Sequence, residues 1–168
     1  DDLNVEVKES ATTLSRDVWE TVSAFANTAG GTIVLGVSER AGFVPVENFE
    51  TEKVLNQFVS GMGDAGGRGK LANPPKYTIE RVELQGVIVL VITIEELDPS
   101  SKPCYVIERG AQGGSYKRID DKDVPLSSTE VLALASYGRA TPSDRDAVAG
   151  AGADDLDETL VDRTIDRA

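Results

Sequence analysis

The basic and aromatic side chains that could bind a ligand lie mostly in two segments of this sequence. One is a glycine-rich stretch at residues 61–70 that holds five glycines, and the other follows residue 104. Lysine and arginine bind phosphate groups, and tyrosine rings can stack on unpaired bases. The sequence therefore predicts a nucleic-acid-binding set made of Arg68, Lys70, Lys76, Tyr105, Arg109, Tyr116, Lys117, Arg118 and Lys122.

A structural interpretation of the same residues stays open. Charges on hairpin surfaces can serve only to keep a protein in solution. Arg118 could form an ion pair with Asp120 or Asp121 instead of binding a ligand. The stripe that contains Trp19 and Phe25 is most simply core, and we attach no function to it.

Two other kinds of chemistry are disfavoured by residue type. The sequence contains no histidine, which removes Ser–His and Cys–His nucleophilic pairs and histidine-ligated zinc sites. Gly69-Lys70 superficially resembles the end of a P-loop. Asp64, however, replaces the required first glycine, and Leu71 replaces the Ser or Thr that ligates magnesium. We therefore expect no ATP site here.

The overall charge works against a nucleic-acid partner. The net charge is −12, and residues 141–168 contribute eight acids and three arginines to it. The remaining residues still carry a net −7. Because a uniformly acidic surface repels a polyanion, the net charge gives nucleic-acid binding no electrostatic support.

Hydrophobic periodicity predicts the elements of the first half of the chain. Alternation favours a strand over 3–8, and helical spacing favours a helix capped by Ser15 that ends near Thr28. The pattern then predicts a buried strand over 32–37, a short strand over 43–46, a helix capped by Thr51 with its apolar face at 54–62, and a mobile loop over 61–70.

The second half is mostly β. We expect strands over 77–84 and 87–94, a hairpin that pairs 104–107 with 115–119, and a helix capped by Ser127 or Ser128 with Glu130 near its start. The predicted fold is an α/β (α+β) domain. Its mixed, largely antiparallel sheet has about six strands packed by two or three helices.

Composition sets the expected boundaries and compartment. We predict one domain over 1–140, a linker over 141–153, and the start of a helix over 154–168 that leads to a further domain. No apolar run is long enough for a membrane span. The single cysteine, Cys104, fits a reducing cytoplasm as a free thiol.

Four elements of the sequence occur in the order found in a known family. They are VSAFANTAGGTIVLGV at 22–37, Glu6-Val7-Lys8, the glycine-led strand at 86–92, and Lys102-Pro103-Cys104-Tyr105 followed by Tyr116-Lys117-Arg118. Over residues 3–137 the chain resembles the Schlafen AlbA_2 family. The resemblance implies either a DNA-binding domain of a bacterial transcriptional regulator or a ribonuclease of the Schlafen type.

The ribonuclease alternative depends on three carboxylates that the resemblance maps onto this chain. The family's acidic positions correspond to Asp1, Glu6 and Glu39, with Lys8 on the same strand face as Glu6. Three converging carboxylates could hold Mg²⁺ or Mn²⁺ and activate water. In the other interpretation, Glu6 and Lys8 form a solvated polar face and Glu39 is a turn residue.

We predict a nucleic-acid-binding, specifically DNA-binding, domain of a bacterial transcriptional-regulator-like protein. It would have no chemistry and no cofactor of its own. The alternatives are the metal-dependent nuclease and a protein-interaction module, which the acidic surface would tolerate. The expected partners are DNA or RNA bound weakly, a downstream domain, and a second copy of the chain.

Overall fold

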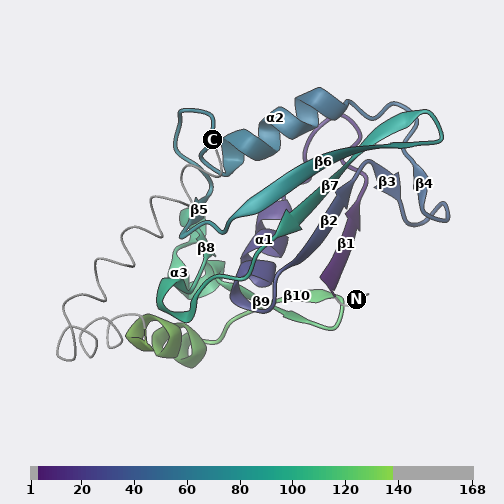
Figure 1. The fold of residues 1–168 in the computed structure, drawn as a ribbon. Coiled ribbons are helices and arrows are strands. Elements are labelled where there is room, and N and C mark those ends of the chain that lie inside the picture. Colours follow the sequence, from purple (N-terminus) through teal and green to yellow (C-terminus); the bar gives the residue numbers. More distant parts are fainter. Residues whose placement is uncertain (1–3, 138–168) are drawn as a thin grey trace.

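The central feature of the computed structural model, which describes residues 4–137, is a four-stranded sheet (Figure 1). Its strand order is β1 (Val5–Lys8), β2 (Gly31–Leu35), β7 (Val87–Ile94) and β6 (Tyr77–Leu84). β1 runs parallel to β2, whereas the β2–β7 and β6–β7 pairs are antiparallel. The predicted α+β class with a mixed, largely antiparallel sheet is confirmed.

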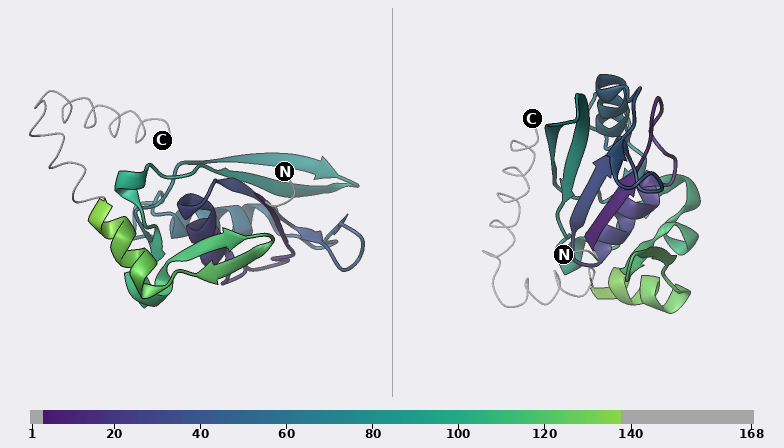
Figure 2. Two further views of the ribbon diagram at one scale, coloured as in Figure 1. Left: turned by 90° about the horizontal axis from the view of Figure 1, so that it is seen from below. Right: turned by 90° about the vertical axis from the view of Figure 1, so that its right-hand side faces the viewer.

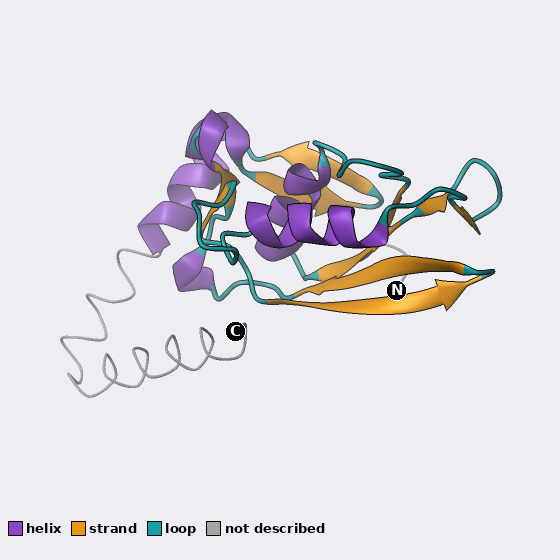
Figure 3. Ribbon diagram, turned by 90° about the horizontal axis from the view of Figure 1, so that it is seen from above, coloured by secondary structure: helices purple, strands orange, loops and turns teal. Residues whose placement is uncertain are grey.

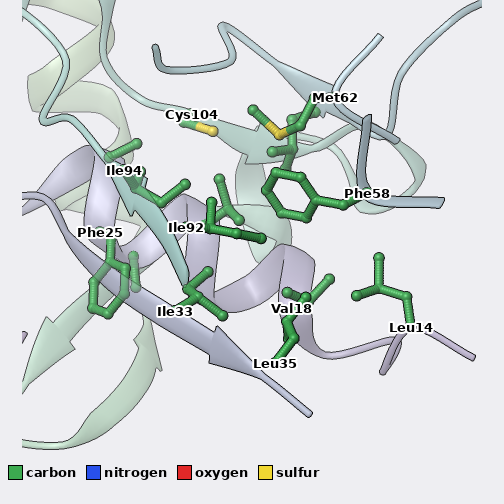
Figure 4. Packing of buried hydrophobic residues seen from close by; sticks show 14 of the residues in the cluster. Leu14, Val18, Phe25, Ile33, Leu35, Phe58, Met62, Ile92, Ile94 and Cys104 are labelled. Carbon is green, nitrogen blue, oxygen red and sulfur yellow. The ribbon is translucent and has the colours of Figure 1, made fainter. Parts of the chain in front are cut away.

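Two helices cover one face of this sheet. α1 (Val18–Asn27) and α2 (Thr51–Gly61) lie on the same side of the β6–β7 hairpin (Figure 3). The side chains between helices and sheet form the core shown in Figure 4, which includes Ile33, Ile92 and Phe58. The strand over 32–37 was predicted to be buried throughout, but in β2 only Ile33 and Leu35 are buried, because only one face of the sheet is covered by these helices.

A third layer lies on the far side of α1. The ribbon of β9 (Tyr116–Ile119) and β10 (Lys122–Pro125) packs there, so α1 is enclosed between the sheet and this ribbon (Figure 2). The polar residues Thr21 and Ser23 of α1 are consequently buried together with its apolar ones. A simple amphipathic pattern did not predict this enclosure.

The strand pairing of the second half differs from the prediction. β8 (Tyr105–Val106) pairs with β5 (Leu71–Ala72), and only one bridge joins Tyr105 to Ser115. β9 pairs instead with β10, because Asp120 adopts a positive φ of 54° and reverses the chain between Ile119 and Lys122. The strands outside the four-stranded sheet therefore form two-stranded ribbons instead of widening it to six strands.

The strand predicted over 32–37 is interrupted. Gly36, with φ +97°, separates β2 from β3 (Val37–Ser38), which pairs with β4 (Val44–Pro45). A Cβ at Gly36 would lie 2.6 Å from the ring of Phe49, so both conformation and space require glycine.

Helix starts follow tertiary contacts more than the capping pattern. α1 begins at Val18, after Asp17, although Ser15 was the predicted cap. Thr51 does not cap α2, since its hydroxyl donates to the carbonyl of Ile88 at 2.6 Å. At the helix that covers residues 128–137, however, Ser127 and Glu130 form the predicted reciprocal cap.

The remaining elements are short. They are the 3-10 helices η2 (Pro99–Ser101) and η3 (Ile107–Arg109) and the single turn α3 (Ala111–Gly114). Within residues 4–137, no helix is long and apolar enough to cross a membrane. The predicted linker over 141–153, the predicted helix over 154–168 and Asp1 lie outside the described residues, so the domain boundaries stay predictions.

Candidate nucleic-acid interface

The structure contains a cavity of about 1240 Å³ between the start of α1, the polar face of α2, the 61–70 loop and η3. It is lined by Thr13, Leu14, Arg16, Trp19, Glu20, Lys53, Asn56, Gln57, Ser60, Gly61, Ala65, Arg68, Lys70, Val106, Glu108 and Arg109. We call it the cationic cavity, because five of these residues are Lys or Arg and only two are acids.

The wall of the cavity formed by α2 follows from a local pattern of polar residues in the sequence. Lys53, Asn56, Gln57 and Ser60 recur at helical spacing, so they form one polar face of α2 while Phe58 faces the core. Gln57 also fixes the segment before α1, because its side-chain oxygen accepts a hydrogen bond of 2.7 Å from the backbone N–H of Leu14.

The β5–β8 ribbon joins the loop wall to the η3 wall. Next to the paired residues Leu71 and Val106, the backbone N–H of Ile107 donates to the carbonyl of Lys70 at 2.9 Å. Lys70 and Arg109, which are far apart in sequence, are thereby held at the same cavity. Arg109 is itself oriented by Glu20, 3.0 Å away, and by the hydroxyl of Tyr116.

Trp19 forms an aromatic wall. Its indole stacks on Phe58 with ring centroids 5.5 Å apart, and it packs so closely on Gly61 that a Cβ there would lie 2.1 Å from the indole. Gly61 is in turn tied to the loop, since its carbonyl accepts from the N–H of Lys70 at 2.6 Å. The loop is anchored at both ends; its predicted mobility stays a prediction.

Four of the five cations have no acidic partner. Arg109 pairs with Glu20, but the side chains of Arg16, Lys53, Arg68 and Lys70 are exposed and form no ion pair with any residue in 4–137. In a chain with a net charge of −12, this is a local reversal of the electrostatic sign.

Three predicted binding residues, Arg68, Lys70 and Arg109, meet at this cavity. Others do not line it: Lys117 pairs with Glu130 at 2.6 Å, and Lys122 is exposed at the start of β10. Lys76 and Tyr105 are half-buried outside the lining. These four residues remain separate from the cationic cavity.

The burial of Tyr116 and Arg118 does not support the ligand-binding roles predicted for them. Tyr116 is 7% exposed, so its ring is not a free stacking platform. The side chain of Arg118 is only 2% exposed and is paired with Glu6 at 2.8 Å and Asp123 at 2.6 Å. Arg118 thus forms ion pairs with Glu6 and Asp123, whereas the sequence suggested Asp120 or Asp121 as partners, and its role in binding stays a prediction.

Arg118 links three layers of the fold. Its guanidinium lies over the ring of Phe25 on α1, 4.9 Å from the centroid, between Glu6 of β1 and Asp123 of β10. The second oxygen of Asp123 accepts a hydrogen bond from the hydroxyl of Thr21. Burial acts to lower the pKa of Arg118, but the hydrogen bonds that its guanidinium donates to both carboxylates raise that pKa above its usual value.

Lys8 extends the same group of charges. Its ammonium lies 3.5 Å from Glu6 and 3.1 Å from Asp17, and its side chain is buried. Burial works to raise the pKa of Asp17, but the Lys8 charge and the hydroxyl of Ser15 outweigh it and lower that pKa. Glu6 and Lys8 thus belong to a partly buried charge network and do not form a fully solvated face.

The predicted carboxylate site is only partly described. Glu6 is engaged by Lys8 and Arg118, Glu39 is exposed in the turn between β3 and β4, and Asp1 lies outside the described residues. Within residues 4–137, no three or more Asp, Glu, Cys or His side chains group in a way that could hold a metal ion. The Asp1–Glu6–Glu39 site therefore remains untested.

The sequence interpretation missed Arg16, Trp19 and Lys53 as site residues. The polar stripe of α2 was visible as 53, 56, 57 and 60, a spacing that puts Lys53 on a solvent-facing side. Nothing local indicated that this stripe faces Arg16 and Trp19, since that depends on the packing of α1 against α2.

Fold and site together define a small α+β domain with a cationic cavity beside a mixed sheet. The sequence model of the family described as "Schlafen, AlbA_2" matches residues 1–127. The chain therefore belongs to the Schlafen AlbA_2 family, as its four sequence elements predicted.

Two solved structures are similar. The solution NMR structure of the N-terminal domain of a protein related to the ATP-dependent DNA helicase RecG, from Nitrosomonas europaea, has a TM-score of 0.53 and 28% identity. The match covers 73% of this chain and 82% of the chain in that structure. The DIP2311 protein of Corynebacterium diphtheriae has a TM-score of 0.51 and 14% identity, covering 79% of this chain and 23% of its own. The second likeness concerns the fold alone. The comparison with curated proteins gave no match.

Proposed function

We propose that this domain binds nucleic acid, with DNA as the first candidate, through the cationic cavity. The observation that carries the proposal is the convergence of Arg16, Lys53, Arg68 and Lys70 without acidic partners among the described residues. Unpaired cations attract phosphate groups, and the surrounding negative charge would confine the polyanion to this place.

Membership of the family and the likeness to the N-terminal domain of a RecG-related protein support a nucleic-acid-related role. The finer role, DNA binding within a bacterial transcriptional-regulator-like protein without chemistry of its own, is part of the proposal. So is the expectation that binding needs no metal or other cofactor.

Fluorescence anisotropy with a labelled DNA oligonucleotide tests the proposal. Binding should weaken as salt rises, and the double variant Arg68→Ala/Lys70→Ala should reduce the slope of log K against log salt by about 2, since each lost phosphate contact accounts for about 1. The control is Arg40→Ala, which removes an exposed cation outside the cavity lining and should leave binding nearly unchanged.

The proposal fails if the folded protein binds neither DNA nor RNA at low salt. It also fails if Arg40→Ala and the cavity double variant weaken binding equally per charge removed, because binding would then follow net charge alone.

The metal-dependent nuclease and the protein-interaction module stay predictions of lower rank. The carboxylate of Glu6 already holds Arg118 and Lys8, so it has less freedom to ligate a metal ion. We expect no RNA cleavage with Mg²⁺ or Mn²⁺. Metal-dependent cleavage that is lost in a folded Glu6→Gln variant would reverse the order of the two proposals.

A further inference from the structure

We infer that the cationic cavity takes unpaired nucleotides of a single strand, with a base against Trp19 and the flanking phosphates on the unpaired cations. This inference rests on the proposed function and narrows it to one class of nucleic acid. It assigns roles to Trp19, Asn56 and Ser60, which a phosphate-binding surface alone would not need.

The size of the cavity limits what can enter. Pockets for small molecules have volumes of roughly 300–1,000 Å³, so about 1240 Å³ leaves room for more than one nucleotide. In a duplex every base is paired and stacked inside the helix, and a base can enter a pocket only after it has been taken out of the stack. A duplex could touch the rim but could not place a base inside.

Trp19 supplies an aromatic surface, to which a base can bind but a phosphate group does not. The indole stacks on Phe58 and packs on Gly61, so its position is set from inside the protein, and it is half-buried as part of the cavity lining. Bases stack on aromatic side chains without regard to sequence, because every base has a π face. In duplex DNA those faces are already stacked on neighbouring pairs.

The wall formed by α2 offers hydrogen-bonding groups next to the cations. Asn56 and Ser60 are exposed, line the cavity, and follow Lys53 on the same helix face. An amide and a hydroxyl can each donate to and accept from the edge of an unpaired base. Cations, an aromatic wall and polar side chains thus surround one volume, which is the combination used to bind single strands.

The chain has only one tryptophan, so its emission reports on this cavity alone. We would titrate the full chain at low salt with a dodecamer of dT, a dodecamer of U, and a mixed-sequence duplex of the same length. We expect quenching by a single strand and binding about tenfold tighter than to the duplex. Whichever of dT and U binds more tightly identifies DNA or RNA as the source of the strand.

Two variants test the location. Trp19→Leu should lower single-strand affinity about tenfold, the effect of losing one stacked base. Because Trp19 also packs on Phe58, a second variant that spares the core is needed. Ser60→Leu fills part of the cavity and should weaken single-strand binding, whereas Ser136→Leu, exposed on the 128–137 helix, should not.

The outcomes separate the two proposals. Duplex binding as tight as single-strand binding, or single-strand binding without a change in tryptophan emission, overturns this inference while the proposed function stands. Absence of binding to all three probes overturns both.

Discussion

The role of Arg118 in the structure differs from the role that its sequence motif suggested. It occupies a family motif and is cationic, yet it lies buried between Glu6 and Asp123. A cation in that position joins the first strand to the last ribbon. Its charge is already engaged by two carboxylates.

We therefore expect Arg118→Ala to act on stability and not directly on binding. Removing one partner of a buried ion pair leaves uncompensated charges, and the cost is about 3–5 kcal/mol of unfolding free energy. Urea denaturation followed by circular dichroism measures this. The control is Arg81→Ala, which breaks an exposed pair with Glu52 and should leave the midpoint nearly unchanged. Equal midpoints for the two variants would show that Arg118 does not hold the layers together.

Asp17 gives a pH-dependent prediction. Its pKa is lower in the folded protein than the usual 3.8, because Lys8 and Ser15 outweigh the effect of burial. The stability from this pair is therefore present above the unfolded pKa and is lost as pH falls through the folded pKa.

The melting temperature of Asp17→Asn should accordingly be lower than that of the wild type at pH 7. The difference should shrink as pH falls below 3.8 and through the lower pKa of the folded protein, where the wild-type carboxylate also becomes neutral. Calorimetry at a series of pH values measures both. A difference that stays constant across the series would show that the charge of Asp17 is not involved.

At the scale of elements, α1 holds the β9–β10 ribbon through two polar side chains. Ser23 donates to the carbonyl of Cys104 at 2.7 Å and accepts from the N–H of Tyr116 at 3.0 Å. Asn27 accepts from the N–H of Cys104 and donates to the carbonyls of Cys104 and Tyr116. These residues lie within the family phrase at 22–37, and their role is to satisfy backbone groups between layers.

Asn27→Ala should therefore be strongly destabilising. It leaves the N–H of Cys104 and the carbonyl of Tyr116 without this partner, at a cost of about 2–4 kcal/mol, since each unsatisfied buried group costs about 1–3 kcal/mol. Denaturant unfolding measures the loss. Asn56→Ala, an exposed asparagine on α2, is the matched control. Similar stability of both variants would mean that the layers are joined mainly by apolar contacts.

The contact between the end of α2 and Trp19 gives a further prediction. A Cβ at Gly61 would lie 2.1 Å from the indole, so Gly61→Ala must displace Trp19 or the helix end, at a cost of about 1–3 kcal/mol. Its tryptophan emission should shift as well. Gly67→Ala, in the same loop with nothing within 4 Å of its Cβ, should change neither stability nor emission. An unchanged spectrum for Gly61→Ala would contradict the packing of this wall.

At the scale of the whole molecule, the distribution of charge matters more than its sum. Residues 141–168 carry eight acids and three arginines, and the cationic cavity belongs to the remainder of the chain. Acidic residues attached to the same molecule compete with a polyanion for its cations.

A chain shortened to residues 1–140 should therefore bind DNA more tightly than the full chain at low salt. The difference should disappear near 0.5 M salt, where the Debye length is about 4 Å. The melting temperature should be the same for both chains, as the predicted boundary near residue 140 requires. Loss of the melting transition on shortening would show that the boundary is wrong.

The individual helices and strands of this protein could be predicted from sequence. The alternation in β6 and the apolar run of β7, the positions of α1 and α2, and the reciprocal cap of Ser127 and Glu130 depend on residues that are close in the chain. Their boundaries were correct to within a few residues. The family phrase also identified the helix–glycine–strand unit formed by α1 and β2. Periodicity succeeds in these places because each element exposes one set of side chains to a common core.

Which strands pair, and which charges are free, was decided only by the tertiary structure. β9 pairs with β10 and not with β8, and Arg118 meets a glutamate 112 positions away in the sequence. Arg16, Lys53 and Lys70 come from separate elements and share one cavity with Trp19. The presence of these cations and the place of each on its own element follow from local sequence. Whether a cation is neutralised or left for a ligand depends on the carboxylates that packing brings within about 4 Å, and sequence spacing does not encode that distance.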